Sequence, residues 1–193
     1  MESIKEILSK LGPLAPLAGV WEGDQGDDTA PADDRGTEKN VFIERLTLTP
    51  FGPVNNHEQQ LYGLRYATVA TRKGDSDPFH EETGYWLWDA KEKQVLRCFL
   101  VPRGVAVLAG GTVEPDARSF FLSAEVGSST YGISSNLFLD REFKTVRYEL
   151  KVTIHADGRF SYEEDSQIQM KGRKELFHHI DKNTLKRKKG ECP

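Results

Sequence analysis

The sequence has few cysteines, no long apolar run and no excess of charge of one sign. Only Cys98 and Cys192 occur among its 193 residues, which argues against a disulfide scaffold or a cysteine-ligated zinc site. No run approaches the ~20 apolar residues of a membrane-spanning helix, and the segment from Met1 to Gly12 lacks the apolar core of a signal peptide. The sequence therefore indicates a cytoplasmic protein with no membrane partner.

The balance of charge gives the chain no overall attraction to nucleic acid or anionic lipid. The formal net charge is -4, from 26 basic and 30 acidic residues. Acidic residues gather between Glu22 and Glu38, and basic residues between Lys171 and Lys189. We interpret these segments as a solvated acidic loop and a basic last strand, and we expect no nucleic-acid partner.

Length and composition are those of one globular domain with a sizeable core, since 37% of the residues are hydrophobic and 29% are charged. We expect a single domain over residues 1–193, with an N-terminal helix in 1–13, a barrel over 14–188 and a flexible tail over 189–193. Apolar residues between Ile4 and Leu11 recur at helical spacing, so this short helix is expected to cover an opening or edge of the main body. The aperiodic stretch from Gly23 to Gly36 is predicted to be a long exposed loop.

Alternation of apolar and polar residues with a period of two dominates the rest of the chain. It is cleanest from Lys144 to Ile154, which is followed by an Asp157-Gly158 turn and a second alternating run from Phe160, so a β-hairpin is predicted here. With a short strand around Val20, the other runs bring the total to about ten: 41–48, 59–71, 83–88, 95–101, 105–113, 119–124 and 176–185.

About ten short antiparallel strands joined by tight turns predict an all-β fold, a closed up-and-down β-barrel of the fatty-acid-binding-protein or lipocalin kind. Closure removes the exposed sheet edges that otherwise favour aggregation. A barrel of this size encloses a lumen that a small-molecule ligand or bulky side chains must fill, and the chain has 10 Phe, 6 Tyr and 3 Trp. A two-layered sandwich is the alternative architecture.

The five histidines are the main candidates for chemistry, because the sequence has no phosphate-binding loop, no nucleophile elbow and no His-Glu-x-x-His motif. We expect His57 and His155 to be inert surface residues. His80 is expected to bond to a carboxylate, with a ligand role as the alternative. His178 and His179 are adjacent in the last predicted strand, so one faces the lumen and the other faces outward unless a bulge intervenes.

A lone neutral imidazole inside an apolar barrel is a ready axial ligand for haem iron. The alternative is a hydrogen-bonded core histidine. The apolar neighbours Leu176 and Ile180 favour His178 as the residue that faces inward. His179 shares its face with Asp181 and Asn183, a polar combination that is also compatible with an interior hydrogen-bond network.

Several segments resemble the nitrobindin family of haem-binding β-barrels. Gly19, Trp21 and Gly23 match the family motif Gly-x-Trp-x-Gly-x-Gly, whose last glycine is displaced to Gly26 in this chain. The segment 79–85, Phe-His-Glu-Glu-Thr-Gly-Tyr, and a histidine in the final strand also match. The resemblance covers most of the chain, from about Leu14 to Lys188.

The resemblance implies a ten-stranded barrel that holds ferric haem b through a histidine of the last strand. The nearest match to that ligand is His179, which precedes the basic ending at Leu185-Lys186-Arg187, and His178 is the second candidate. The resemblance also implies nitric oxide binding and the isomerisation of peroxynitrite to nitrate at the iron. By analogy, the further residues expected near the cofactor are Trp21, His80, Trp86, Trp88 and Phe99.

Two other functions stay open at this point. One is a non-enzymatic carrier of another apolar small molecule, lipid-like or aromatic, in the lumen without haem. The other is a barrel filled by its own aromatic side chains whose surface contacts a protein partner. A homodimer is also open. Cys98 is expected to be free, buried and unreactive, and Cys192 to be incidental.

Overall fold

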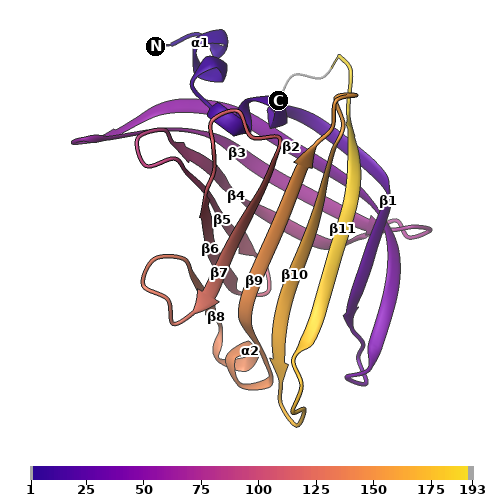
Figure 1. Ribbon diagram of the computed structural model, residues 1–193. Helices are drawn as coiled ribbons and strands as arrows, with labels where there is room; N and C mark the ends of the chain where they lie inside the picture. Colours follow the sequence, from indigo (N-terminus) through magenta and orange to yellow (C-terminus); the bar gives the residue numbers. More distant parts are fainter. Residues whose placement is uncertain (1, 191–193) are drawn as a thin grey trace.

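Eleven β-strands close into a barrel in the computed structural model of the protein, which describes residues 2–190 (Figure 1). Around the barrel the strands follow the order β1-β11-β10-β9-β7-β8-β6-β5-β4-β3-β2, and β2 pairs with β1 to complete the circle. The predicted closed barrel with a short N-terminal helix is confirmed, and the sandwich is excluded. Cys192 and most of the predicted tail over 189–193 lie outside the described residues.

The strands are β1 Gly19–Pro31, β2 Thr37–Asn56, β3 Gln59–Arg72, β4 Pro78–Asp89, β5 Gln94–Val101, β6 Val105–Thr112, β7 Ser119–Val126, β8 Gly132–Ser135, β9 Phe143–Ile154, β10 Phe160–Met170 and β11 Phe177–Arg187. Neighbouring strands pair antiparallel with one exception, because the short β8 lies parallel to β7. The helices are α1 Ile4–Ser9, the 3-10 helix η1 Gly12–Leu17 and α2 Leu137–Glu142. Strand β8 and helix α2 are only four and six residues long and are not predicted by the sequence pattern. None of the described helices is long and apolar enough to cross a membrane.

The stretch predicted as a loop from Gly23 to Gly36 is largely a strand, so that prediction is wrong. Strand β1 continues to Pro31 and pairs with β2 on one side and with β11 on the other. The pattern was hidden for two reasons. A register shift between Gly23 and Gly26 interrupts the alternation. Beyond it, the residue with its side chain buried is the acidic Asp28, not an apolar one.

The hairpin predicted around Asp157 is present between β9 and β10. The His155 backbone N–H donates to the Arg159 carbonyl over 2.9 Å, and Gly158 has a φ of 84°, a conformation that glycine adopts without strain. One face of β9 is buried as expected, with Tyr148, Leu150 and Val152 each 1% exposed. These residues form part of the wall of the barrel core.

The N-terminal segment covers one end of the barrel, which we call the closed end (Figure 1). A capping box between Ser3 and Glu6 starts α1. Leu11, Leu14 and Leu17 then pack into the same core as the strands. The expected covering role of this segment is therefore confirmed, although α1 ends at Ser9 and the separate 3-10 helix η1 extends to Leu17, beyond the expected helix in 1–13.

Candidate functional site

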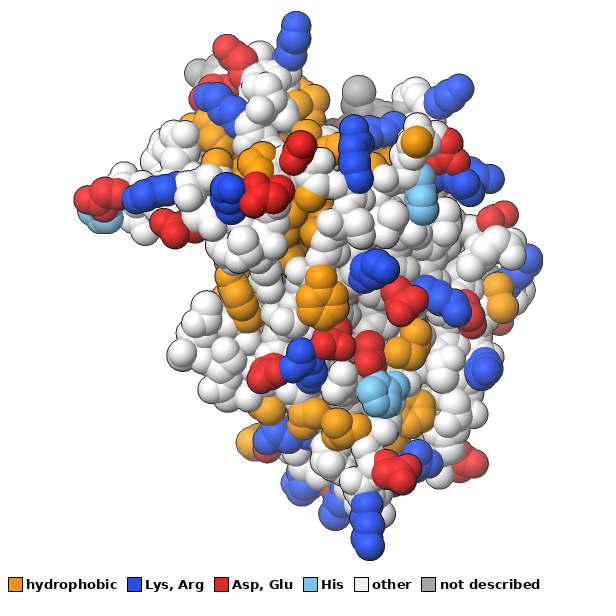
Figure 2. Space-filling model, in the orientation of Figure 1, with side chains coloured by type: hydrophobic (Ala, Val, Ile, Leu, Met, Phe, Trp, Pro, Cys, Tyr) orange, Lys and Arg blue, Asp and Glu red, His pale blue; other side chains and the backbone are white. Residues whose placement is uncertain are grey.

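The inner face of the barrel changes character along its length. Near the closed end it is apolar, with Trp21, Leu64, Trp88 and Leu185 buried in the core. Toward the opposite end, which we call the mouth, charged and polar side chains occupy the inward positions: Asp28, Glu44, Thr68, His80, Glu82, Arg97, Glu164, His179, Asp181 and Asn183. On the outer surface, by contrast, acidic and basic side chains are interspersed over the face drawn in Figure 2.

His179 lies on the inner face of β11, two residues from the buried Phe177 and four from the buried Asn183. Its Nε2 is 3.0 Å from Oδ1 of Asp28 and 3.2 Å from Oδ2 of Asp181. Burial lowers the pKa of His179, but the hydrogen bond to Asp28 and the charges of both carboxylates outweigh it, so the pKa is raised. The side chain stays 29% exposed and is therefore accessible at the mouth.

His178 points the opposite way, and the prediction from its apolar neighbours that it faces inward is wrong. Its side chain is 56% exposed on the outer surface, where Nδ1 is 2.7 Å from Oδ2 of Asp165. Apolar neighbours failed as a guide because the inner face is polar at this level. His178 is consequently not placed to contact a ligand in the lumen.

Asp28 and Asp181 face each other directly across β1 and β11. Asp28 is 1% exposed, and its Oδ2 accepts a hydrogen bond of 2.8 Å from Nδ2 of Asn40. Burial raises the pKa of Asp28, but the hydrogen bonds from His179 and Asn40 outweigh burial. The pKa is therefore lowered overall, and Asp28 is held ionised. Burial raises the pKa of Asp181 to about 7; the nearby charges of Asp28 and Glu164 add to the rise, and that of His179 opposes it.

His80 enters the lumen from β4 at the level of the mouth. Its Nε2 is 3.3 Å from Oε1 of Glu82, so the expected bond to a carboxylate is present. Burial lowers the pKa of His80, but the hydrogen bond and the charge of Glu82 outweigh it and raise the pKa. The charge of Asp181 contributes in the same direction, which connects His80 electrostatically with the His179 cluster.

A buried ionic network centred on Arg97 lies beneath the mouth. Nη2 of Arg97 donates to Oε2 of Glu82 over 2.7 Å, while Nη1 contacts Glu164 and the Tyr148 hydroxyl. The Tyr66 hydroxyl also donates to Glu82 over 2.9 Å. Burial raises the pKa of both carboxyls, but the charge of Arg97 lowers that of Glu82 to about 2, whereas the pKa of Glu164 stays raised. The network therefore holds Glu82 ionised.

Aromatic rings surround this arginine. The guanidinium carbon of Arg97 is 4.6 Å from the centre of the Phe99 ring and 5.3 Å from that of Trp86. Trp86 in turn contacts Phe120 edge to face, with 6.4 Å between ring centres. Cation–π attraction of this kind is strongest where water is excluded. Trp86 lies opposite Arg97 in the β4–β5 pair, Phe99 lies one inward position nearer the mouth, and Trp88 lies deeper in the apolar core.

Glu44 forms a second polar cluster on the β1–β2 side of the barrel. It is buried and accepts hydrogen bonds from the Tyr162 hydroxyl at 2.7 Å, from Nδ2 of Asn183 at 3.0 Å and from the Thr68 hydroxyl at 2.9 Å. Burial raises the pKa of Glu44 in spite of these donors. The three donors compensate for the cost of placing a carboxyl inside the barrel.

Trp21 is a structural residue of the closed end. Its indole N–H donates to the Leu17 carbonyl over 2.7 Å, and its ring meets Phe160 edge to face at 4.7 Å. Trp21 lies opposite Arg187, eight residues along β11 from His179, which corresponds to about 26 Å of strand. The structure therefore does not bring Trp21 to the mouth. It fixes η1 on the barrel.

The glycines of the N-terminal motif make room for other side chains. A Cβ on Gly19 would come within 2.6 Å of Nη1 of Arg187, and one on Gly23 within 2.7 Å of the Asn183 amide. A Cβ on Gly26 would overlap the ring of Phe42. The pairing of β1 with β2 shifts register between Gly23 and Gly26, and after the shift Gly26 lies opposite Phe42. The last glycine of the motif is therefore found at Gly26.

Several residues of the polar layer were not singled out from the sequence, namely Asp28, Glu44, Glu82, Arg97 and Glu164. A signal was present in the phase of the alternation. Arg97 lies in phase with the buried Val95 and Phe99, and Glu82 lies in phase with Trp86. A charged residue in phase with the buried apolar residues of its strand is therefore the sequence signal for this polar layer.

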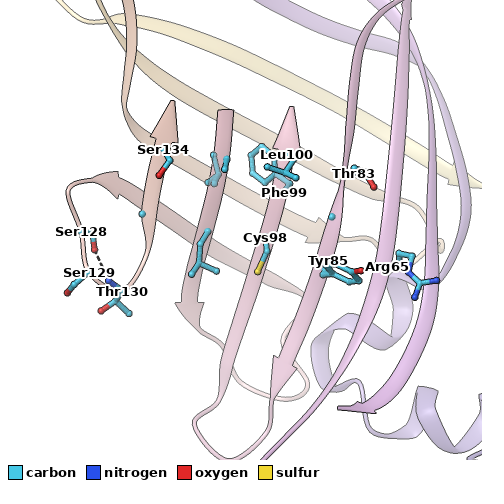
Figure 3. A pocket seen from close by; sticks show the side chains of 15 residues that line it. Arg65, Thr83, Tyr85, Cys98, Phe99, Leu100, Ser128, Ser129, Thr130 and Ser134 are labelled. Carbon is cyan, nitrogen blue, oxygen red and sulfur yellow. Dashed lines mark hydrogen bonds between the residues drawn. The ribbon is translucent and has the colours of Figure 1, made fainter. Parts of the chain in front are cut away.

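A groove of about 610 Å³ lies over β4, β5 and β6 (Figure 3). Cys98 and Tyr85 line it together with the loop residues Ser128 and Thr130. Cys98 is free and only partly buried, and burial raises the pKa of its thiol. A raised pKa leaves little thiolate, which is the reactive form of cysteine.

A closed β-barrel with ionisable side chains at the mouth of its lumen defines a class of small-molecule-binding proteins. Comparison with family models identifies the particular group. The model described as "THAP4-like, heme-binding beta-barrel domain" matches residues 10–187, and the chain belongs to this family. The predicted relation to the nitrobindins is consistent with this match.

A solved structure, that of Rv2717c from M. tuberculosis, has the same fold. It superimposes with a TM-score of 0.69 and 21% sequence identity over 93% of this chain and 98% of that one. At this level of identity the likeness concerns the fold. No curated protein matched the sequence.

The residues at the mouth fit the cofactor of the family. An iron-binding imidazole commonly donates its second ring N–H to a carboxylate, which fixes its orientation. His179 has such a carboxylate in the buried Asp28, and it remains partly exposed toward the lumen. Phe177 shares the inner face of β11 with His179 and packs with Ile168 and Met170 in a small buried apolar cluster.

Proposed function

We propose that the protein binds haem b at the mouth of the barrel, with His179 as the protein ligand of the iron. The observation that carries this proposal is the orientation of the two adjacent histidines. His179 faces the lumen with one ring nitrogen on Asp28, whereas His178 faces outward. Membership of the heme-binding family supports the choice of cofactor.

The role of Asp28 in this proposal is to orient the imidazole. Its carboxylate accepts the Nε2 proton of His179, and Asn40 holds the carboxylate from the other side. Hydrogen bonding to a carboxylate makes an imidazole a more basic ligand and fixes its tautomer. Because Asp28 is buried and ionised, its position does not depend on solvent.

The chemistry we propose is binding of nitric oxide and isomerisation of peroxynitrite, for which bound ferric haem supplies an open coordination position. From the protein side, His80 is the candidate to donate a hydrogen bond to the bound small molecule. It shares the mouth with His179, and Glu82 holds its ring at 3.3 Å. The rings of Trp86 and Phe99 lie against the guanidinium of Arg97 beneath the proposed site.

The test is titration of the haem-free protein with hemin. We expect a stoichiometric Soret band that shifts when nitric oxide is added. His179→Ala should abolish this band, and the matched control His178→Ala should retain it, because the two residues are adjacent but face opposite sides. Failure of the wild-type protein to bind hemin, or equal loss in both variants, contradicts the proposal.

A further inference from the structure

Three ligand-type atoms converge on one point at the mouth. They are Oδ1 of Asp28, Nε2 of His179 and Oδ2 of Asp181, and they all lie within 4.8 Å of one another. Nε2 is 3.0 Å from the first oxygen and 3.2 Å from the second. With zinc bonds of 2.0–2.1 Å, the ligand atoms of a tetrahedral site are about 3.3 Å apart. The two distances from Nε2 are close to this value, and all three ligand atoms lie within 4.8 Å of one another.

The local charge points to a cation at the same place. Asp28 and Glu164 each lie directly opposite Asp181, one on either side of β11. Like charges directly opposite each other in a sheet are destabilising, and burial strengthens the effect. His179 supplies at most one positive charge to these three acids, and Glu164 shares Arg97 with Glu82.

A second layer of residues holds the cluster in place. Nε of Arg72 donates to Oδ1 of Asn40 over 3.0 Å, and Nδ2 of Asn40 donates to Oδ2 of Asp28 over 2.8 Å. This chain of hydrogen bonds leaves Oδ1 of Asp28 directed at His179. Ordered outer partners of this kind are typical of metal ligands.

We infer that Asp28, His179 and Asp181 bind a divalent transition-metal ion of the zinc class in the haem-free protein. One imidazole and two carboxylates suit Zn²⁺, which is bound in proteins by three such ligands and a water molecule. Mg²⁺ and Ca²⁺ prefer six or more oxygen ligands and are expected to bind poorly here. The site shares His179 with the proposed haem site but does not depend on it, and the two ligands are expected to compete.

The experiment is a calorimetric titration of haem-free, chelator-treated protein with Zn²⁺. We expect one ion per chain and no measurable binding of Mg²⁺ at the same concentrations. Asp181→Asn should weaken Zn²⁺ binding at least tenfold, and Asp28→Asn should do the same. Asp181 is the safer position, because its side chain is 29% exposed whereas Asp28 is fully buried. Circular dichroism and thermal melting check that each variant is folded.

The outer surface of the same strands offers a matched control. Asp165 and His178 form a carboxylate–imidazole pair at 2.7 Å but face away from the lumen. The double variant Asp165→Asn, His178→Ala should bind Zn²⁺ as the wild type does. Absence of stoichiometric Zn²⁺ binding, unchanged affinity in folded Asp181→Asn, or equal loss in the outer control overturns the inference. Absence of binding would also identify His179 as a plain counter-ion of the two aspartates.

Hemin titration of the same variants separates the two sites. Asp181→Asn should retain the Soret band while losing Zn²⁺, whereas His179→Ala should lose both. Wild-type protein that binds Zn²⁺ but not hemin contradicts the proposed function and supports the metal site. Protein that binds hemin but not Zn²⁺ supports the proposed function and contradicts the metal site.

Discussion

The closed end and the mouth of this barrel are built from the same strands but are stabilised by different forces. At the closed end the inward residues are large and apolar, and burial of apolar area contributes roughly 25 cal/mol per Å². At the mouth the inward residues are ionisable, and each depends on a specific partner. The comparison shows that one barrel combines a packed core, which holds the fold, with a polar layer that is arranged for binding.

The two regions also respond differently to substitution. Truncation of a buried apolar side chain removes contacts in proportion to the atoms lost, and the surrounding structure partly relaxes into the cavity. A buried charge that loses its partner keeps its full desolvation cost. We therefore expect the largest effects in the polar layer.

Replacing Arg97 tests the polar layer most directly. Arg97→Met should destabilise the protein by about 3–5 kcal/mol, because Glu82 and Glu164 lose their shared partner inside the barrel. Urea unfolding measures this loss. The triple variant Arg97→Met, Glu82→Gln, Glu164→Gln should recover part of it. A loss below about 1 kcal/mol in the single variant would show that the network is not a structural unit.

Two separate leucine substitutions, one on the inner and one on the outer face, test the apolar half. Leu64→Ala, at a fully buried inward position of β3, should cost about 3 kcal/mol in urea unfolding because it leaves a cavity. Leu100→Ala is the control, since Leu100 is 58% exposed on the outer side of β5 and should change stability by less than about 0.5 kcal/mol. Similar losses at the two positions would contradict the assignment of inner and outer faces.

The pH dependence of stability probes Glu82. Burial raises its pKa, but the charge of Arg97 lowers it from 4.5 to about 2, so its contribution is complete above pH 4.5 and declines as the pH falls toward 2. Between pH 4.5 and 3 this amounts to roughly 2 kcal/mol. Glu82→Gln should flatten the stability curve over this interval. A curve as steep as that of the wild type would assign the acid sensitivity to other groups.

The smallest effect concerns the orientation of His179. Asp28→Asn should weaken hemin binding by about tenfold, because the imidazole loses its carboxylate partner while the nitrogen ligand remains. Competition against a protein acceptor of known hemin affinity measures the change. Asp165→Asn, which alters the partner of the outward His178, should leave hemin affinity unchanged. Equal effects of the two substitutions would show that orientation from inside the barrel is unimportant.

Strands are readable from the sequence where their inward residues are apolar, and they are harder to recognise where those residues are polar. In β9 the alternation around Leu150 and Val152 was readable, because its inward residues are apolar along most of its length. In β1 beyond Gly23 the inward residues are small or acidic, so a strand was interpreted as a loop. The histidine pair was ambiguous for this reason too, since the apolar neighbours of His178 lie at a level where the lumen is polar.

Some features had no local signal in the sequence. The convergence of Asp28, His179 and Asp181 joins residues about 150 positions apart, and it exists because β1 closes the barrel against β11. Likewise, Arg97 meets Glu164 across the lumen, not along a strand pair. Contacts of this kind depend on closure and register, which short-range patterns do not specify.

The amino-acid sequence by itself determined that this chain forms antiparallel strands, closes them into a barrel and covers one end with a helix. These features follow from local periodicity and from the need to bury apolar faces. Only the tertiary structure decided which histidine faces the lumen, that a polar layer divides the barrel, and that two aspartates meet on one imidazole. Those outcomes depend on strand register and on pairing between distant segments, because a shift of one residue exchanges the inside of a barrel with its outside.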